Sequence, residues 1–434
     1  MKKFLALILA LVMALSLVAC GGNSGAQGEG DGDAATGSVY YLNFKPEAEE
    51  AWQALAKTYT EQTGVPVKVV TAASGEYETM LVSEMDKDAA PTLFQCNEGG
   101  VATWGDFCYD LSDSAVYNEL ASKDYALKNA DGEVISIAYC LETYGIIVNK
   151  ALLEQAGHSL DEITDFDSLK AVADDIHARA DELGFDAFTS AGLDGSSSWR
   201  FSGHLSNMPL FYEFRDDGIS SKPATIKGTY LDNYKKVWDL YITDSATTGA
   251  ALLTATGDQA EAEFGEGKAV FYQNGTWEYS NLTEKFGMNP DDLTMIPIYC
   301  GVEGEEKAGL CTGTENYWSV NKNAKEEDIK ATLDFLYWVV TSEEGTSMMA
   351  EQFGACPFNS SKAPSNPFSA LANEYVANGC YPVTWAFNYT PAVNDWRAAV
   401  VDALSKYTAG NGSWDDVKTA FVEGWATQYA NENA

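Results

Sequence analysis

The sequence predicts an α/β protein with two lobes, and three observations support this prediction. Stretches with strand character alternate with amphipathic helices, which favours a largely parallel sheet. The chain has 434 residues, which is more than one hydrophobic core normally organises. Apolar residues make up 46% of it and aromatic residues 12%, which is enough to fill two cores.

The first ordered part of the chain shows the alternation most clearly. A strand is expected at 38–43, followed by a helix from Pro46 whose apolar residues recur at helical spacing up to Gly64. The next elements are expected to be a strand at 65–71, a helix at 76–85 and a buried strand at 91–95. Further strands are expected at 145–149, 268–273 and 316–321, and helices at 150–156, 167–183, 231–242, 258–265, 325–340, 392–405 and 414–429.

The N-terminus has the pattern of an export signal. Lys2 and Lys3 precede an apolar run at 4–19, which is shorter than the roughly 20 residues that a membrane-spanning helix needs. The run ends in Leu-Val-Ala-Cys, which resembles the lipobox of bacterial lipoproteins, and this resemblance implies that residues 1–19 are removed and that Cys20 carries a lipid. Residues 21–37 are rich in glycine and polar residues, so we expect a flexible linker from Cys20 to the folded body.

The charge of the chain narrows the class of ligand. The formal net charge is -37, from 64 acidic and 27 basic residues, which disfavours nucleic acid as a partner. Arginine occurs only at 179, 200, 215 and 397, so a substrate with several phosphates or carboxylates would lack its usual binding partners. A neutral ligand fits this composition better.

Cysteine and histidine give no support for a metal site. There is no Cys-x-x-Cys motif, and His158, His177 and His204 are scattered, so neither a metal nor a cofactor is expected. Cys300 and Cys311 flank a charged loop and could face each other across a hairpin; pairing of Cys356 with Cys380, or of Cys96 with Cys108, has weaker support. Complete reduction of these cysteines is an equal alternative.

Four stretches carry a resemblance to a known family. They are YYLNFKPEAEEAWQALAKTYTEQTGVPVKV, ETYGIIVNKALLEQAG, KAVFYQNGTWEYSNL and GTENYWSVNKNAKEEDIKATLDFLYWVVTSEEG, the last with FGACPFN after it. Together they resemble the extracellular solute-binding proteins of carbohydrate ABC importers, the family that includes maltose-binding protein. The resemblance implies a periplasmic-binding-protein-like fold, in which two α/β lobes are joined by a hinge and close on a ligand in the cleft between them. It also implies interleaved lobes, with 38–140 and 299–345 in one lobe and 141–298 and 346–434 in the other.

Residues that follow strands are the candidates for ligand binding. A sugar presents flat C–H faces and hydroxyl groups, so its site combines aromatic rings with amides and carboxylates, beyond the carboxyl ends of strands. Trp277 matches a position where relatives stack a sugar ring. The candidates at strand ends and crossovers are Asn43, Phe44, Asn97, Glu142, Tyr144, Asn274, Trp277, Glu315 and Tyr317; Trp199, Arg200 and His204 are expected in a loop before a helix, and Trp385 and Asp395 come late in the chain.

Other aromatic residues are assigned to packing. Trp52, Trp338 and Trp425 fit the apolar faces of helices, and the alternation of strand residues turns Trp318 away from Tyr317. Trp199, Arg200 and His204 could also brace the second lobe without touching a ligand.

The sequence thus predicts a non-catalytic binding protein that captures a neutral oligosaccharide and delivers it to an ABC permease. We expect it to be a monomer, tethered by a lipid to the outer face of a bacterial membrane, with a Gram-positive surface favoured. A glycoside hydrolase is the alternative from another class, although no Gly-x-Ser-x-Gly or His-Glu-x-x-His motif occurs. A peptide- or amino-acid-binding protein of the same fold, and a sensor or adhesin without its own transporter, stay open.

Overall fold

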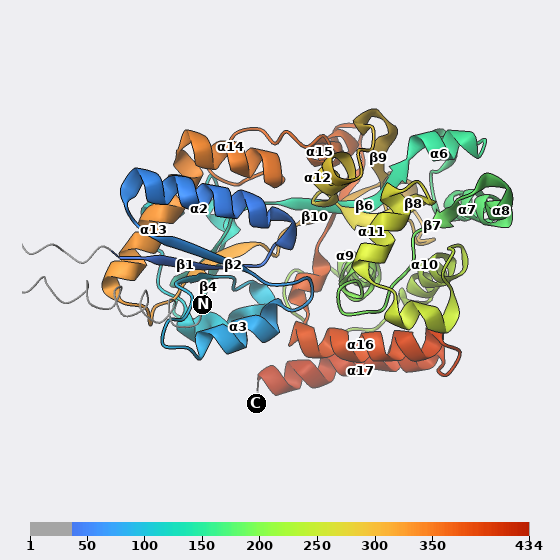
Figure 1. Cartoon of the computed structure of the whole chain (residues 1–434). Coiled ribbons are helices and arrows are strands. Elements are labelled where there is room, and N and C mark those ends of the chain that lie inside the picture. The colour runs from blue at the N-terminus through green and yellow to red at the C-terminus, as the bar shows by residue number, and fades with distance from the viewer. Residues whose placement is uncertain (1–36, 434) are drawn as a thin grey trace, which may run out of the picture. The chain divides into compact units, whose positions relative to one another are not determined.

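Residues 37–433 are described by a computed structural model, so the predicted signal, Cys20 and most of the linker lie outside the described residues. Within this range the strands form two six-stranded sheets (Figure 1). The first sheet has the order β2-β1-β3-β11-β5-β4 and contains β1 (Val39–Asn43), β2 (Val67–Thr71), β3 (Leu93–Phe94), β4 (Ala126–Lys128), β5 (Val134–Ala138) and β11 (Tyr317–Val320).

The second sheet has the order β12-β10-β6-β8-β7, with β9 paired to β6. Its strands are β6 (Glu142–Asn149), β7 (Asp186–Phe188), β8 (Ala269–Gly275), β9 (Leu293–Ile296), β10 (Ala308–Gly313) and β12 (Tyr381–Thr384). Both sheets are mixed, which corrects the expectation of largely parallel sheets. Strand β11 is antiparallel to β3 and β5, and β6 is antiparallel to β8, β9 and β10. The reason is that β6 and β11 enter their sheets directly from the other sheet, without a helix that would reverse the chain.

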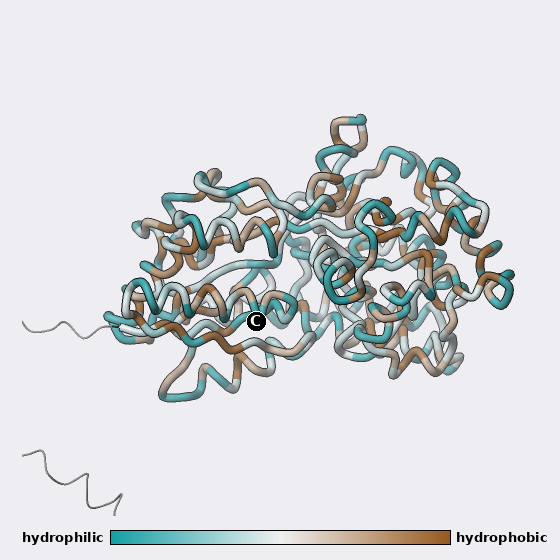
Figure 2. The backbone as a smooth tube through the Cα atoms, turned by 45° about the horizontal axis from the view of Figure 1, so that its top comes forward, coloured by the Kyte–Doolittle hydropathy of each residue, from teal (hydrophilic) through white to brown (hydrophobic). Residues whose placement is uncertain are grey.

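Helices pack on both sheets. Those of the first sheet are α2 (Glu49–Thr63), α3 (Tyr77–Met85), α4 (Val101–Trp104), α5 (Ala115–Glu119), α13 (Glu326–Thr341) and α14 (Glu343–Gln352). The others are α6 (Lys150–Gln155), α7 (Phe166–Ala178), α8 (Ala180–Leu183), α9 (Ser206–Asp217), α10 (Leu231–Thr243), α11 (Gly257–Gly265), α12 (Glu278–Ser280), α15 (Phe368–Ala377), α16 (Val393–Thr408) and α17 (Trp414–Glu432). Figure 2 shows hydrophilic and hydrophobic residues alternating along single helices, as expected for helices that cover a sheet on one face.

Local sequence explains the first helix–strand unit. Trp52, Leu55, Ala56 and Tyr59 are the buried residues of α2, at the spacing that the sequence predicts, and Gly64 ends the helix with φ of 77°. In β1, Tyr41 packs in the core under α2, while its neighbour Leu42 packs in the core on the other face of the sheet. Strand β1 thus supplies both cores that flank the first sheet.

The predicted packing roles are confirmed for the buried tryptophans. Trp52, Trp318 and Trp425 are fully buried. Trp318 contacts Trp52, with ring centroids 6.0 Å apart, and stacks on Tyr139. Trp338 is half-buried and packs on Tyr59.

The chain passes between the sheets at three places, and strand pairing decides where. It leaves β5 at Ala138 and enters the second sheet at Glu142, close to the boundary expected at 140. The chain returns to the first sheet between β10 and β11. This is later than the boundary expected at 299, because β10 pairs with β6 and β12 and so still belongs to the second sheet. Phe353 and Phe358 still pack in the core of the first sheet. The last passage to the second sheet therefore comes later in the chain than the boundary expected at 345.

All seven described cysteines are free thiols. Cys300 and Cys311 do not form the expected hairpin pair, because Glu305–Lys307 forms a 3-10 turn and β10 pairs with β6 and β12. None of the described helices combines the length and the hydropathy that a bilayer crossing requires.

Candidate ligand-binding site

Several strands and loops meet at one edge of the second sheet. Tyr144, at the start of β6, pairs with Gly275 at the end of β8 and with Cys311 of β10. The loop after β1 of the first sheet reaches the same place, because Lys45 Nζ lies 2.7 Å from Glu142 Oε1. Residues that follow β1, β8 and β10 are therefore neighbours in space although they are far apart in the chain.

An aromatic cluster occupies this edge of the sheet. His204 stacks on Tyr144 with ring centroids 3.9 Å apart. Trp199 and Trp277 flank His204, at centroid distances of 5.0 and 5.4 Å. Trp385 lies 5.4 Å from Tyr144 and stacks on Phe387. We call Tyr144, Trp199, His204, Trp277, Trp385 and Phe387 the aromatic cluster; the structure thus brings together five residues that the sequence predicts as ligand contacts.

Two glycines set the positions of two indole rings. A Cβ atom on Gly275, at the end of β8, would lie 2.3 Å from the ring of Trp277. A Cβ atom on Gly313, at the end of β10, would lie 2.5 Å from Cγ of Trp385. Each ring can lie against the backbone only because glycine has no side chain. Strand ends that finish in glycine therefore support the two tryptophans.

The segment that carries Trp199 and His204 is helical, which corrects the expectation of a loop. Residues Arg200–Leu205 form a π-helical turn that continues into α9. The Trp199 indole donates a hydrogen bond to the carbonyl oxygen of Ser196, at 2.9 Å. π-Helical turns are rare in proteins, and those that do occur are often found at functional sites.

Arg200 lies beneath this segment and is 1% exposed. Its guanidinium donates hydrogen bonds to the carbonyl oxygens of Gln273 and Ser190 and to the hydroxyl of Ser197. These contacts hold the π-helical turn against β8. A direct contact between Arg200 and a ligand stays a prediction.

His204 acts as a neutral ring. Burial, together with the charges of Arg397 and Arg200, lowers its pKa well below the ordinary value. The Gln273 amide nitrogen lies 3.3 Å from His204 Nδ1, so the amide donates to Nδ1 and the proton is on Nε2. A neutral imidazole stacked on a phenol ring extends the aromatic surface without adding charge.

A buried ion pair joins the loop after β1 to the start of β6. Lys45 Nζ lies 2.7 Å from Glu142 Oε1 and 2.8 Å from Glu47 Oε1. Asn316, between β10 and β11, donates its amide N–H to Glu142 Oε2 at 2.5 Å. Lys45 Nζ also lies 5.6 Å from the ring centroid of Trp277, which is within the range of a cation–π interaction. The predicted residue Glu142 lies at the passage from β5 to β6. It contacts Asn316 at the passage from β10 to β11 and, through Lys45, is linked to Trp277 of the aromatic cluster.

Two further acidic residues lie beside the second crossover. The hydroxyl of Tyr317 donates a hydrogen bond to Glu98 Oε1 at 2.8 Å. Glu315 pairs with Arg397 of α16 at 3.4 Å, and the Arg397 guanidinium lies 5.2 Å from the ring centroid of Phe387. Glu315 is thus linked through Arg397 to Phe387 of the aromatic cluster, and contacts of Glu315 and Tyr317 with a ligand stay predictions.

Other predicted residues serve local structure. Asn43 is buried and donates to the carbonyl oxygen of Lys45 and to Thr71. Phe44 packs edge-on against Tyr77. Asn97 caps the 3-10 turn Glu98–Gly100 (η2). Asn274 donates to Tyr272 and to Glu278. Asp395 is exposed in the first turn of α16.

The predicted set does not contain every residue of the site. Lys45, Asn316 and Phe387 each sit next to, or two residues from, a predicted residue. Lys45 carried one usable signal, because it is a lysine just after a strand in a strongly acidic chain. Its burial follows from Glu142, which is almost 100 residues away, and sequence pattern does not reveal such a pair.

Unused hydrogen-bonding atoms collect at this site. Buried polar atoms in folded proteins nearly always have a partner, so a group of them without partners indicates a place for a polar ligand or for water. Among the described residues, the buried side-chain atoms that lack a partner and belong to residues of the site or to their direct neighbours are Glu98 Oε2, Arg200 Nε, Gln273 Oε1, Glu278 Oε2, Asn316 Oδ1, Trp385 Nε1, Asn388 Oδ1 and Arg397 Nε.

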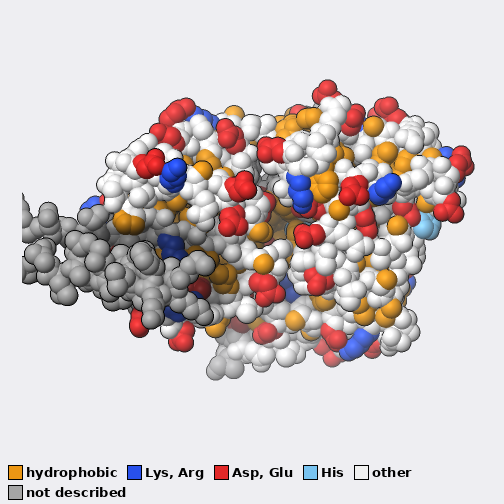
Figure 3. All heavy atoms as spheres, in the orientation of Figure 1, with side chains coloured by type: hydrophobic (Ala, Val, Ile, Leu, Met, Phe, Trp, Pro, Cys, Tyr) orange, Lys and Arg blue, Asp and Glu red, His pale blue; other side chains and the backbone are white. Residues whose placement is uncertain are grey.

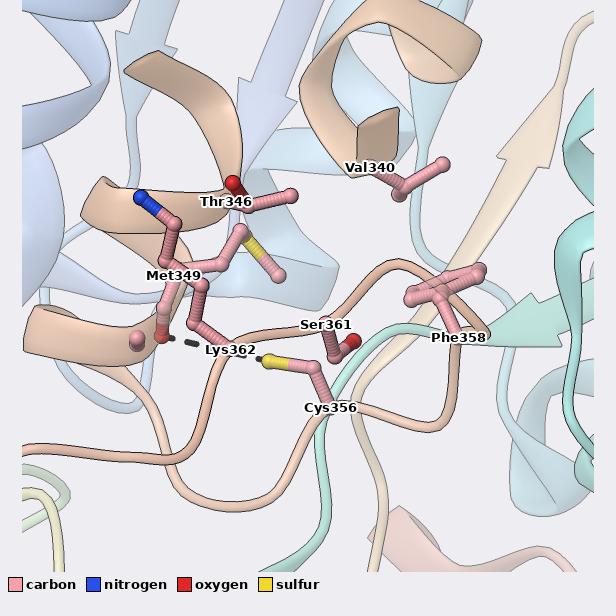
Figure 4. A pocket seen from close by; sticks show the side chains of 8 residues that line it. Val340, Thr346, Met349, Cys356, Phe358, Ser361 and Lys362 are labelled. Atoms are coloured by element: carbon pink, nitrogen blue, oxygen red, sulfur yellow. Dashed lines mark hydrogen bonds between the residues drawn. The ribbon is translucent and has the colours of Figure 1, made fainter. Parts of the chain in front are cut away.

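Two other features of the described residues do not compete with this site. No group of three or more His, Cys, Asp and Glu residues within 37–433 could hold a metal ion. A separate hollow beside α14 has a volume of about 10 Å³, which is room for one water molecule at most. It is lined by Val340, Thr346, Met349, Cys356, Phe358, Ser361 and Lys362 (Figure 4).

Comparison with known families assigns the chain to one class. Residues 54–375 match the bacterial extracellular solute-binding protein family, and this match covers more than half of the chain. The protein is a member of that family.

Solved structures share the fold. RafE in complex with raffinose superimposes with a TM-score of 0.69 at 18% identity, over 90% of this chain and 99% of that chain. A chitin oligosaccharide binding protein gives a TM-score of 0.69 at 15% identity, over 91% and 99% of the two chains. A sugar transporter protein from Bacillus licheniformis in complex with stachyose gives 0.68 at 16% identity, over 90% and 99%. These similarities confirm the predicted periplasmic-binding-protein-like fold.

Proposed function

We propose that this solute-binding protein captures an oligosaccharide at the aromatic cluster and delivers it to an ABC permease. The observation that carries this proposal is the combination of flat rings with unused polar atoms. The rings of Trp277 and Trp385 suit the C–H faces of sugars, and the unused atoms around them suit hydroxyl groups. Similar proteins with raffinose and stachyose bound support a ligand of this kind.

The charges of the site favour a ligand without anionic groups. The charge of Arg397 is balanced by Glu315, and that of Lys45 by Glu47 and Glu142, so neither cation carries an uncompensated charge for a phosphate or a carboxylate. The proposed ligand is therefore neutral, in agreement with the scarcity of arginine in the sequence.

The same observation disfavours a peptide or an amino acid. The terminal carboxylate of such a ligand would need an arginine, and the two candidates are Arg200 and Arg397. Arg200 is engaged by two backbone carbonyl groups and a serine, and the charge of Arg397 is balanced by Glu315.

Delivery to a permease and attachment to the membrane complete the proposal. The lipobox-like sequence at Cys20 supports a lipid anchor at the outer face of a bacterial membrane. Acidic side chains are spread over the face of the molecule in Figure 3, and they could meet basic patches on the permease. Charge-reversing substitutions of these acidic residues that leave sugar uptake intact would count against this docking surface.

A ligand screen tests the proposal. The purified protein is heated with raffinose, stachyose, maltotetraose, cellotetraose and chitin tetraose in separate samples. A ligand at 100 times its Kd should raise the free energy of unfolding by about 2.7 kcal/mol. Absence of any shift across the panel at millimolar sugar would contradict the proposal.

The fate of the sugar separates binding from hydrolysis. A binding protein returns its ligand unchanged, so chromatography after a long incubation should recover the intact saccharide. Release of shorter products by the protein would instead support the hydrolase alternative.

A further inference from the structure

Glu98 lies where the loop after β3 meets the second sheet's helices. It begins η2, which follows β3 of the first sheet. The next residue, Gly99, touches α16, because a Cβ atom on Gly99 would lie 2.6 Å from Cγ1 of Val393. Glu98 therefore lies where the loop after β3 meets α16. A ligand bound between the two sheets would lie next to this contact.

The two oxygens of this carboxyl group differ. Oε1 accepts the hydrogen bond from Tyr317, whereas Oε2 is buried and has no partner among the described residues. The charged groups nearby do not offer a cation. Glu315 repels a negative charge on Glu98, and the guanidinium of Arg397 is paired with Glu315. Within residues 37–433 no lysine, arginine or histidine forms an ion pair with Glu98.

A carboxylate in this position would be unfavourable, and a carboxylic acid would not. A buried carboxylate needs a cation or several donors. Here it has the Tyr317 hydroxyl and its own backbone N–H as donors, no cation, and an acidic neighbour. A protonated carboxyl group keeps the hydrogen bond from Tyr317 on Oε1 and needs a single acceptor for the O–H on Oε2. A sugar hydroxyl or ring oxygen supplies such an acceptor.

We propose that Glu98 binds the saccharide as a neutral carboxylic acid that donates a hydrogen bond from Oε2 to a ligand oxygen. This inference rests on the proposed function. It makes Glu98 a specificity-determining residue that selects for an oxygen acceptor, and it links sugar affinity to pH.

The direction of the pH effect follows from the free protein. Burial raises the pKa of Glu98 to about 7 and the charge of Glu315 acts in the same direction, while the hydrogen bonds from its own backbone N–H and from Tyr317 oppose them. The protonated form predominates below this pH and is lost above it. If only this form binds, the apparent Kd rises about tenfold between pH 6 and pH 8. Binding at pH 8 then takes up as much as one proton.

Calorimetry measures both effects. The protein is titrated at pH 6, 7 and 8 with the tightest saccharide of the panel, in two buffers of unlike ionisation enthalpy. The expected result is an affinity that weakens as pH rises and a heat that depends on the buffer at pH 8.

Variants assign the effect to Glu98. In Glu98→Gln the amide N–H mimics the acid, so the affinity should be the same within about threefold at pH 6 and pH 8, with no proton uptake. In Glu98→Ala the donor is lost, and binding at pH 6 should weaken at least tenfold. Glu78→Gln is the matched control, because Glu78 is a half-buried acid with a raised pKa on α3 that accepts a hydrogen bond from Trp104, away from the aromatic cluster. It should keep the pH profile of the unaltered protein.

The outcomes are distinct. Failure of every saccharide to bind contradicts the proposed function itself. Binding with a flat pH profile, or a Glu98→Gln variant as weak as Glu98→Ala at pH 6, overturns only the role of Glu98. Tighter binding of chitosan tetraose than of cellotetraose, abolished in Glu98→Gln, would show that Glu98 acts as a carboxylate toward an ammonium group and would also overturn this inference.

Discussion

His204 stacks on Tyr144 with ring centroids 3.9 Å apart and planes 11° from parallel. The pair joins two parts of the second sheet's assembly, because Tyr144 starts β6 and His204 belongs to the π-helical turn before α9. Both rings are buried, so the pair forms the base of the aromatic cluster.

The pairing predicts an acid-sensitive stability. The pKa of His204 is lowered in the folded state, so the unfolded state binds more protons once the pH falls below about 6.5. The stabilising contribution of neutral His204 is present above this pH and is lost as the pH falls. The free energy of unfolding should therefore fall with acidification by up to about 1.4 kcal/mol per pH unit from this residue. Urea unfolding of the protein and of His204→Asn from pH 7 to pH 5 measures the difference in slope.

His158 provides the control for this experiment. Burial alone would lower its pKa, but its hydrogen bonds to Glu162 and Asp175 raise it overall. Its contribution is present below about pH 6.5 and is lost as the pH rises through the folded-state pKa. His158→Asn should thus change the slope in the opposite sense, and equal slopes in both variants would contradict the assignment.

Trp277 is expected to supply much of the stacking energy. Replacement by alanine should weaken oligosaccharide binding at least tenfold, which is about 1.4 kcal/mol. Trp338→Ala is the control, since Trp338 is also half-buried but packs on Tyr59, on the first sheet. Isothermal titration calorimetry of both folded variants measures their Kd for the oligosaccharide. An unchanged Kd in Trp277→Ala would remove this ring from the site.

The ion pair of Lys45 and Glu142 should be costly to break from one side. Lys45→Met leaves Glu142 buried without its cation, which should lower the free energy of unfolding by about 3–5 kcal/mol. Adding Glu142→Gln removes the stranded charge, so the double variant should recover part of this loss. The exposed pair of Lys57 and Glu61 serves as control, and Lys57→Met should leave the urea midpoint unchanged. A double variant less stable than Lys45→Met would contradict the account.

Contact between two glycines should affect ligand retention. A Cβ atom on Gly75 would lie 2.4 Å from the carbonyl oxygen of Gly195, next to the Ser196 carbonyl that binds the Trp199 indole. Gly75→Ala should push this loop away and speed the dissociation of the saccharide several-fold. Gly132→Ala carries the same backbone strain, with φ of 86° against 80°, but a Cβ atom there meets nothing within 4 Å. Stopped-flow rates that change equally in both variants would point to a general loss of stability.

Sequence pattern predicts the local parts of this fold well. The helix that ends at Gly64 and the strand that ends at Asn43 follow from spacing and from a left-handed glycine, which are properties of a few neighbouring residues. The mixed character of the sheets does not follow, because it depends on which distant strands pair. Strand β10 shows this: Cys311 pairs with Tyr144 across 167 positions of the chain, and not with the nearby Cys300.

The candidate site shows the same limit. Trp277 could be predicted because it is an aromatic residue soon after a strand, and Trp385 because it lies late in the chain, where relatives contribute another aromatic residue. Lys45 and Asn316 could not, because only Glu142 brings them together. The helical state of the segment after Trp199 was also missed, since its serine and glycine residues suggest a loop and the buried Arg200 stabilises a helix there.

The free thiols have a consequence for the stability of the folded body. Residues 37–433 contain no covalent cross-link, so their melting temperature should be the same with and without dithiothreitol. Its stability against heat instead comes from non-covalent packing, such as the contact between the rings of Trp52 and Trp318 in the core. An unfolded molecule can then return to its native form without a partner enzyme that reshuffles sulfur bonds, which is an advantage wherever oxidants are scarce.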